Sequence, residues 1–187
     1  MRRFAAGAGL AALMLVGARS EAQVSVFVEK GPAVGAVAPD FTLASATADT
    51  VSGLGSFTLF KTRGQVVVLA FFPKVFMSGS DAQFARFREQ RAELFGDEVL
   101  VAGISVDPPD ELGRYAAFLG LPYPLLSDVE QKVGKRYGLV SRPGEPTRRA
   151  VYVIGRDGQV RYRDFRFDAT NDASFSRLGA AVRAARR

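Results

Sequence analysis

The sequence contains no cysteine and no histidine. Without cysteine the chain has no disulfide, no thiolate nucleophile and no redox-active thiol. Without histidine it also lacks the commonest general base and the commonest metal ligand of proteins. We therefore expect neither a metal site nor a cofactor, and any chemistry must use other side chains.

The composition is that of an ordinary globular domain. The chain has 187 residues, of which 48% are hydrophobic and 24% charged. Its formal net charge is +6, and the first 22 residues contribute +2 of this, which leaves a moderate +4. Arginines alternate with aromatic residues between 161 and 167, a mixture also found in nucleic-acid-binding proteins. We favour an exposed strand there and expect no nucleic-acid partner.

The N-terminus has the pattern of an export signal. Arg2 and Arg3 precede an apolar run from Phe4 to Gly17, and Ser20-Glu21-Ala22 fits a small-x-small cleavage site. The alternative is a single-span membrane anchor, but the run is short for a bilayer, and no cysteine follows it to carry a lipid.

We therefore predict a signal peptide over 1–22, an N-terminal extension over 23–34 and one domain over 35–187. The mature protein is expected to be secreted or periplasmic, in a bacterium, with no membrane span after cleavage.

Apolar runs and turn residues predict alternating strands and helices. Continuous apolar runs at 65–72, 99–106 and 150–155 are typical of strands buried on both faces, and Arg156-Asp157-Gly158 turns the last into a hairpin. Short strands are expected at 24–29, 38–43 and 58–60, with a loop or wide hairpin over 44–57. Helices are expected over about 81–95, from Asp107-Pro108-Pro109 to Gly120, from a Ser127-x-x-Glu130 capping box to Gly138, and over 171–186. This order predicts an α/β fold with a mixed sheet.

Several motifs resemble one family. "VGAVAPDFTL", "VVVLAFFPK", "GISVDPPDELGRYAAFLGLPYPLLSD", "VGKRYGL" and "RAVYVIGRDGQV" follow one another in an order that resembles the peroxiredoxins, the thiol peroxidases of the thioredoxin-like fold. The resemblance is strongest to the bacterioferritin-comigratory, or Q, type and covers about 35–167. It implies a central mixed β-sheet flanked by helices on both faces. Because peroxiredoxins often dimerise, it also makes a homodimer a candidate state.

The resemblance implies a site whose reactive atoms are missing. Pro73 and Arg149 stand at the family's proline and arginine positions. Met77 stands at the position of the peroxide-binding threonine, and Ser80 at that of the peroxidatic cysteine. The resolving cysteine of the Q type corresponds to Ala85, and a glutamate common in this subgroup corresponds to Gln83. No catalytic set is intact, so the resemblance fits the fold better than the activity.

Serine cannot replace cysteine in peroxiredoxin chemistry. A thiolate attacks a peroxide oxygen and becomes a sulfenic acid, whereas a serine oxygen has no such oxidation step and here has no histidine to activate it. We predict a pseudo-peroxidase with a binding or interaction role. Ser80-x-x-Gln83 also fits a helix capping box, and a Ser/Lys hydrolase using Lys74 is a further alternative.

Two other residues leave alternatives open. Met77 is the only sulfur left after signal cleavage, so it is either a peroxide-responsive thioether or a space-filling side chain. Arg149, near the N-terminus of the helix that begins at Ser80, either binds a small anion or peroxide-like ligand or pairs with an acid such as Asp81. Its neighbour Arg148 is expected on the opposite face of the strand.

Overall fold

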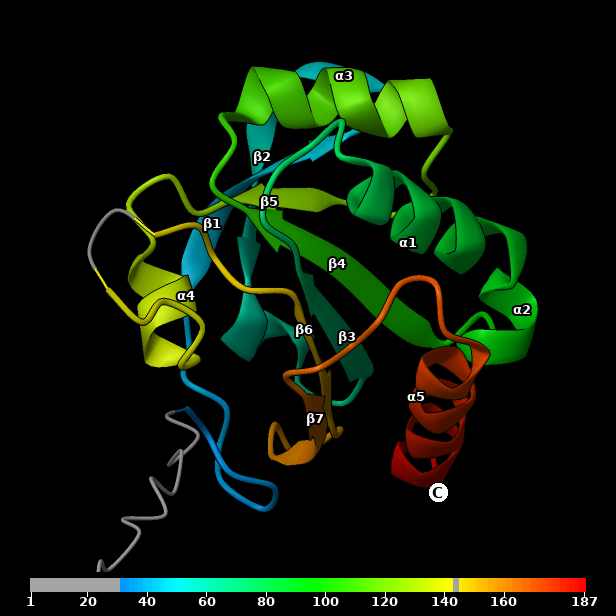
Figure 1. Ribbon diagram of the computed structural model, residues 1–187. Coiled ribbons are helices and arrows are strands. Elements are labelled where there is room, and N and C mark those ends of the chain that lie inside the picture. The colour runs from blue at the N-terminus through cyan, green and yellow to red at the C-terminus, as the bar shows by residue number, and fades with distance from the viewer. Residues whose placement is uncertain (1–30, 143–144) are drawn as a thin grey trace, which may run out of the picture.

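The computed structural model describes residues 31–142 and 145–187 (Figure 1). The predicted signal peptide and the predicted strand at 24–29 lie outside these residues. The strands are β1 (Thr42–Thr47), β2 (Thr50–Thr58), β3 (Val66–Phe71), β4 (Val99–Ser105), β5 (Leu125–Ser127), β6 (Ala150–Ile154) and β7 (Val160–Asp164). The helices are α1 (Ser78–Glu89), α2 (Arg91–Leu94), α3 (Pro109–Leu119), α4 (Lys132–Arg136) and α5 (Asp172–Ala185), with a 3₁₀ turn at Leu59–Thr62.

The seven strands form one mixed sheet in the order β2-β1-β5-β4-β3-β6-β7. Strands β3, β4 and β5 are parallel, while β6, β7, β1 and β2 join antiparallel to their neighbours. The all-apolar strand β3 lies between β4 and β6 and is buried along its whole length. Central parallel strands are buried on both faces, which explains the continuous apolar runs.

Alternate residues of each central strand supply two cores. In β6, Val151 and Val153 pack with α1, α2, α3 and α5 on one face, whereas Tyr152 and Ile154 pack with α4 and the N-terminal segment on the other. Figure 1 shows α1, α2 and α5 together on one side of the sheet and α4 on the other. The predicted fold class, a mixed sheet with helices on both faces, is confirmed.

Some predicted local features are wrong. Of the two alternatives for 44–57, the hairpin forms and the loop does not, but β1 and β2 take up most of this segment, so the strands predicted at 38–43 and 58–60 are misplaced. The capping box at Ser127 does not form: Ser127 ends β5, and α4 begins only at Lys132. Asp128 takes the capping role instead, since its carboxylate accepts hydrogen bonds from the backbone N–H groups of Val133 (3.2 Å) and Gly134 (2.8 Å).

Asp107 anchors a loop and does not cap a helix. Helix α3 has Pro109 at its first position and no side-chain cap, and it ends as predicted at Gly120, in left-handed backbone with φ 60°. The buried carboxylate of Asp107 accepts hydrogen bonds from Val75 N (2.9 Å) and Ser105 Oγ (2.8 Å). It thereby ties the loop after β3 to the end of β4.

Candidate functional site

The loop between β3 and α1 carries the first predicted site residues. Phe72 N donates to Ile104 O (3.0 Å) and Val75 N to Asp107, so the loop is fixed to β4 at two points. Pro73 lies between these points and is half-buried. Phe76 then adopts left-handed backbone with φ 54°, which is costly for a bulky side chain. The loop therefore enters α1 along a fixed path.

Ser80 is fully buried in the first turn of α1, and its hydroxyl donates to the carbonyl oxygen of Lys74 (2.8 Å). The predicted capping box with Gln83 is wrong, because α1 begins at Ser78 with Met77 as its N-cap residue. Ser80 is then already helical, and its N–H donates to Met77 O (2.8 Å). Through its hydrogen bond to Lys74 O, the hydroxyl links the first turn of α1 to the preceding loop.

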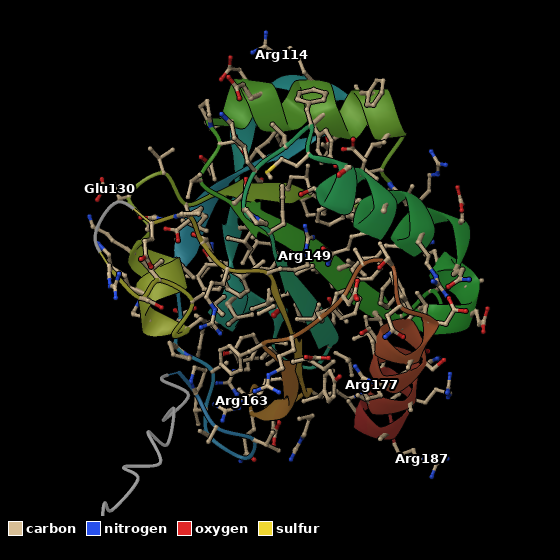
Figure 2. The ribbon with its side chains drawn as sticks, viewed as in Figure 1. Arg114, Glu130, Arg149, Arg163, Arg177 and Arg187 are labelled. Carbon is tan, nitrogen blue, oxygen red and sulfur yellow. The ribbon has the colours of Figure 1, made fainter. Side chains whose placement is uncertain are left out.

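Arg149 reaches this serine from the segment that precedes β6. Its Nη2 donates to Ser80 Oγ (3.4 Å), and its Nη1 donates to Gln83 Oε1. A Cβ atom at Gly79 would lie only 3.1 Å from Nη2, so the absence of a side chain there lets the guanidinium lie against the first turn of α1. Figure 2 shows Arg149 in the centre of the molecule, below α1.

Arg148 lies on the opposite side, as predicted. Its guanidinium carbon is 5.8 Å from the ring centre of Phe165, which packs against the core on the α4 side of the sheet. The two neighbouring arginines therefore serve different faces, and only Arg149 belongs to the site.

The acid near Arg149 is already bound elsewhere. Asp81 Oδ1 accepts a hydrogen bond from the hydroxyl of Tyr115 on α3 (2.7 Å), and within residues 31–142 and 145–187 no carboxylate forms an ion pair with Arg149. The predicted alternative of an Arg149–Asp81 pair is wrong. Burial lowers the pKa of Arg149, and the charges of Tyr115 and Asp168 oppose this shift. Burial, followed by the hydrogen bond to Asp81, raises the pKa of Tyr115.

Gln83 leaves one polar atom without a partner. Its side chain is fully buried, and its Oε1 must face Arg149 because a guanidinium only donates. Its Nε2 has no hydrogen-bond partner within the described part of the chain. A buried amide N–H without an acceptor costs about 1–3 kcal/mol. The site therefore contains a positive charge and a donor group that lacks an acceptor.

The remaining predicted residues surround this centre. Met77 is 49% exposed, so it does not fill a buried space. Lys74 is exposed, and it contacts Ser80 through its carbonyl oxygen, while its amine forms no hydrogen bond with Ser80 within the described chain. Ala85 is half-buried on α1.

Across the described ranges no group of three acidic side chains is placed to hold a metal, and no helix there is long and apolar enough to span a membrane.

Sequence reasoning missed Tyr115 and Asp168. Tyr115 lies within one of the family-like motifs, but nothing in that motif singles out its hydroxyl. Asp168 follows the last strand. For both residues, neither the spacing nor the residue type pointed to a charge interaction with Arg149. Their proximity arises only when α3 and the segment before α5 pack beside α1.

Known proteins similar to this chain share one family. A sequence model of the AhpC/TSA family matches residues 34–163. A thiol peroxidase from Halalkalibacterium halodurans is 33% identical over 154 residues, which cover 81% of this chain and 88% of that protein. An alkyl hydroperoxide reductase E from Mycobacterium tuberculosis is 32% identical over 136 residues, 71% of this chain and 85% of that protein.

Solved structures agree with these relatives. Peroxidoxin BcpB from Mycobacterium tuberculosis superposes with a TM-score of 0.71 at 26% identity, covering 83% of this chain and 99% of that one. A cysteine-to-serine mutant of PrxQ from Xylella fastidiosa superposes with a TM-score of 0.70, covering 84% and 99% of the two chains. Its identity is only 17%, so it supports the fold alone.

The geometry predicts the behaviour of a thiol placed at position 80. In Ser80→Cys, the guanidinium of Arg149 lies beside the sulfur and favours the thiolate, so the thiol pKa is expected to be lower by about 1 or more than in Ser80→Cys/Arg149→Met. Titration of the thiolate ultraviolet absorbance measures both. Equal pKa values in the two variants would show that Arg149 does not act on this position.

Proposed function

The chain belongs to the AhpC/TSA family of peroxiredoxins, and on that premise we propose that it is a non-catalytic member that binds a small anion at Arg149. One observation carries the proposal. At the position matching the peroxidatic sulfur, a buried serine hydroxyl donates to Lys74 O and accepts from Arg149. The arginine and its surroundings remain, while the oxidisable atom is gone.

The loss of peroxidase chemistry follows from this arrangement. A sulfenic acid requires sulfur, and the chain has no cysteine to form or to resolve one. The Ser80 hydroxyl is also occupied as a donor to a backbone carbonyl, and no histidine is present to remove its proton. Peroxide bound near Arg149 would therefore meet no nucleophile of the family's kind.

A steady-state assay tests the loss of activity. Mature protein given hydrogen peroxide and a thioredoxin reducing system is expected to consume peroxide no faster than the reducing system alone. The Met77→Leu variant should give the same baseline. Sustained consumption by wild-type protein, with recycling of the reductant, would refute the non-catalytic assignment.

The electrostatics of the site favour an anion. Among the described residues Arg149 donates only to neutral acceptors, Ser80 and Gln83, and the amide at Gln83 supplies no negative charge where the subgroup commonly has a glutamate. The N-terminal end of α1 adds positive potential at the same point. The Nε2 of Gln83 is a further donor without an acceptor in the described chain. A small oxyanion or carboxylate would satisfy this set of donors.

Anion binding can be tested with a neighbouring arginine as control. Titration of sulfate, phosphate and acetate, followed by amide chemical shifts, is expected to perturb the first turn of α1. Arg149→Met should weaken binding about tenfold or more, because a charge-assisted contact contributes roughly 1.5–3 kcal/mol. Arg148→Met, with the same charge change on the other face, should bind like wild type. If both variants lose anion affinity equally, the effect comes from the net charge of the protein, and a specific site at Arg149 is refuted.

Met77 supports a second candidate, a peroxide-responsive protein of the same family. Its side chain is 49% exposed at the start of α1, so its thioether is open to dissolved oxidant. Attack of the thioether sulfur on a peroxide oxygen yields methionine sulfoxide and water, and a reductase must supply electrons to reverse it. Without such a reductase the response is stoichiometric.

Graded peroxide followed by peptide mass spectrometry tests this candidate. If Met77 is a sensor, its sulfoxide forms at peroxide concentrations that leave free methionine largely unmodified. Oxidation at the same rate as free methionine would mean simple exposure and would end the sensor hypothesis. Arg149→Met provides a control, since a faster reaction caused by the site should slow in that variant.

We further propose that the protein acts outside the cytoplasm, on the basis of the charged, apolar and small-residue pattern over 1–22. Mass spectrometry of protein expressed in a bacterial host is expected to find a mature N-terminus near Gln23. A chain that retains Met1 would contradict export by cleavage.

A further inference from the structure

Two residues other than glycine adopt left-handed backbone in the described part of the chain. Phe76 (φ 54°) belongs to the loop that enters α1, and Gln131 (φ 55°) is the residue before α4. This conformation is uncommon for residues with a long side chain, whereas glycine adopts it readily. Strain of this kind persists where the surrounding structure requires it. The side chain of Gln131 therefore needs a use that glycine could not supply.

The amide of Gln131 reaches across to a distant segment. Its Nε2 donates to the backbone oxygen of Glu145 (2.8 Å) and to the hydroxyl oxygen of Thr147 (3.4 Å), which lie 14 and 16 residues further along the chain. The backbone N–H of Gln131 is used separately, since it donates to Asp128 O (2.8 Å). Both acceptors of the amide belong to the segment 145–149, so the side chain ties the start of α4 to that segment.

The segment held in this way carries Arg149. Thr147 is buried two residues earlier, and a Cβ atom at Gly134 of α4 would lie 3.3 Å from its Oγ1, so Thr147 packs closely against α4. Arg148 N donates to Leu139 O (2.9 Å), and β6 begins directly after Arg149. In Figure 1 this segment runs from the side of α4 to β6. The backbone of Arg149 is therefore fixed by α4 on one side and by the sheet on the other.

The contact that this segment positions is sensitive to small movements. Arg149 Nη2 lies 3.4 Å from Ser80 Oγ, which is long for a hydrogen bond. The effect of the guanidinium charge on a group at this position falls as the distance between them grows. A small shift of the segment 145–149 would therefore weaken the interaction of Arg149 with the first turn of α1.

We propose that Gln131 positions Arg149 at the anion site, by holding the segment 145–149 through the hydrogen bonds of its side-chain amide. The inference rests on the proposed function, because Arg149 provides the charge of that site. Among the described residues Gln131 forms no hydrogen bond with Arg149 or Ser80, so it acts through the backbone of the segment. The start of α4 is in this way coupled to the first turn of α1.

A thiol at position 80 reports where the guanidinium lies. In Ser80→Cys, Gln131→Met keeps the side-chain length but removes the N–H donor. It should raise the thiol pKa by about 0.5, which is roughly a threefold change in the ionisation equilibrium. Gln131→Gly also lacks the donor and relieves the left-handed backbone, so it should raise the pKa equally. Gln159→Met makes the same exchange in the turn between β6 and β7 and should leave the pKa unchanged. Titration of the thiolate ultraviolet absorbance measures all of these values.

A double-mutant cycle separates positioning from general loosening of the fold. In Ser80→Cys/Arg149→Met, the further change Gln131→Met should not alter the thiol pKa, since a positioning residue acts only through the group that it positions. A shift of equal size with and without Arg149 overturns the proposal. An unchanged pKa in folded Gln131→Met overturns it too, as does a rise that Gln131→Gly does not share, because that rise would come from backbone strain. Circular dichroism and thermal unfolding establish that each variant folds, and if Gln131→Met does not, Gln131→Gly carries the same test.

Sulfate titration tests the same coupling in the protein that keeps Ser80. Gln131→Met should weaken sulfate binding roughly threefold, and Gln159→Met should bind like wild type. Wild-type protein that binds no sulfate refutes the proposed anion binding, and the thiol titration then still decides whether Gln131 positions Arg149. If sulfate binding depends on Arg149 but Gln131→Met retains wild-type affinity, the proposal is overturned.

Discussion

The contact of Arg149 with the first turn of α1 is the interaction on which the site depends. A partly buried guanidinium loses hydration and must recover hydrogen bonds from the protein, and here it finds them on Ser80 and Gln83. Both partners are neutral. A thiolate at position 80 or a carboxylate at position 83 would each have cancelled the charge, so this chain keeps a cation whose compensation comes only from dipoles and from more distant groups.

That contact exists because three separate elements meet. Asp107, two residues after β4, holds the loop that leads into α1 by accepting from Val75 N, and the hydroxyl of Ser80 donates to Lys74 O of the same loop. Gly79 gives the guanidinium room against the helix. Together these features fix the first turn of α1 beside Arg149, and the buried hydroxyl of Ser80 has both a donor and an acceptor partner there.

The two sheet edges differ in whether their outward backbone groups find partners. On β7, Val160 exchanges backbone hydrogen bonds with Gly35 and Ala36, whereas within the described residues β2 pairs with β1 alone. Gln83 Nε2 is the corresponding case inside the molecule, a donor without an acceptor in the described chain. Unsatisfied polar groups are costly when buried and available for binding when exposed, so each marks a place where the fold alone does not complete its hydrogen bonding.

The central strands of the sheet and the absence of thiol chemistry could be predicted from the amino-acid sequence. Continuous apolar runs located β3, β4 and β6, because strands buried on both faces require them, and the absence of cysteine excluded thiol chemistry whatever the fold. The family-like motifs also pointed to Ser80 and Arg149 as site positions, and the structure brings these two side chains within hydrogen-bonding distance. The hydrogen-bond partners of the polar side chains, in contrast, depend on tertiary packing. Three points depended on the structure: Asp81 binds Tyr115 and not Arg149, α1 begins at Ser78, and Asp107 holds a loop and does not cap a helix. Each depended on a group far away in the chain, and a polar side chain binds whichever partner the packing of distant elements brings within hydrogen-bonding distance.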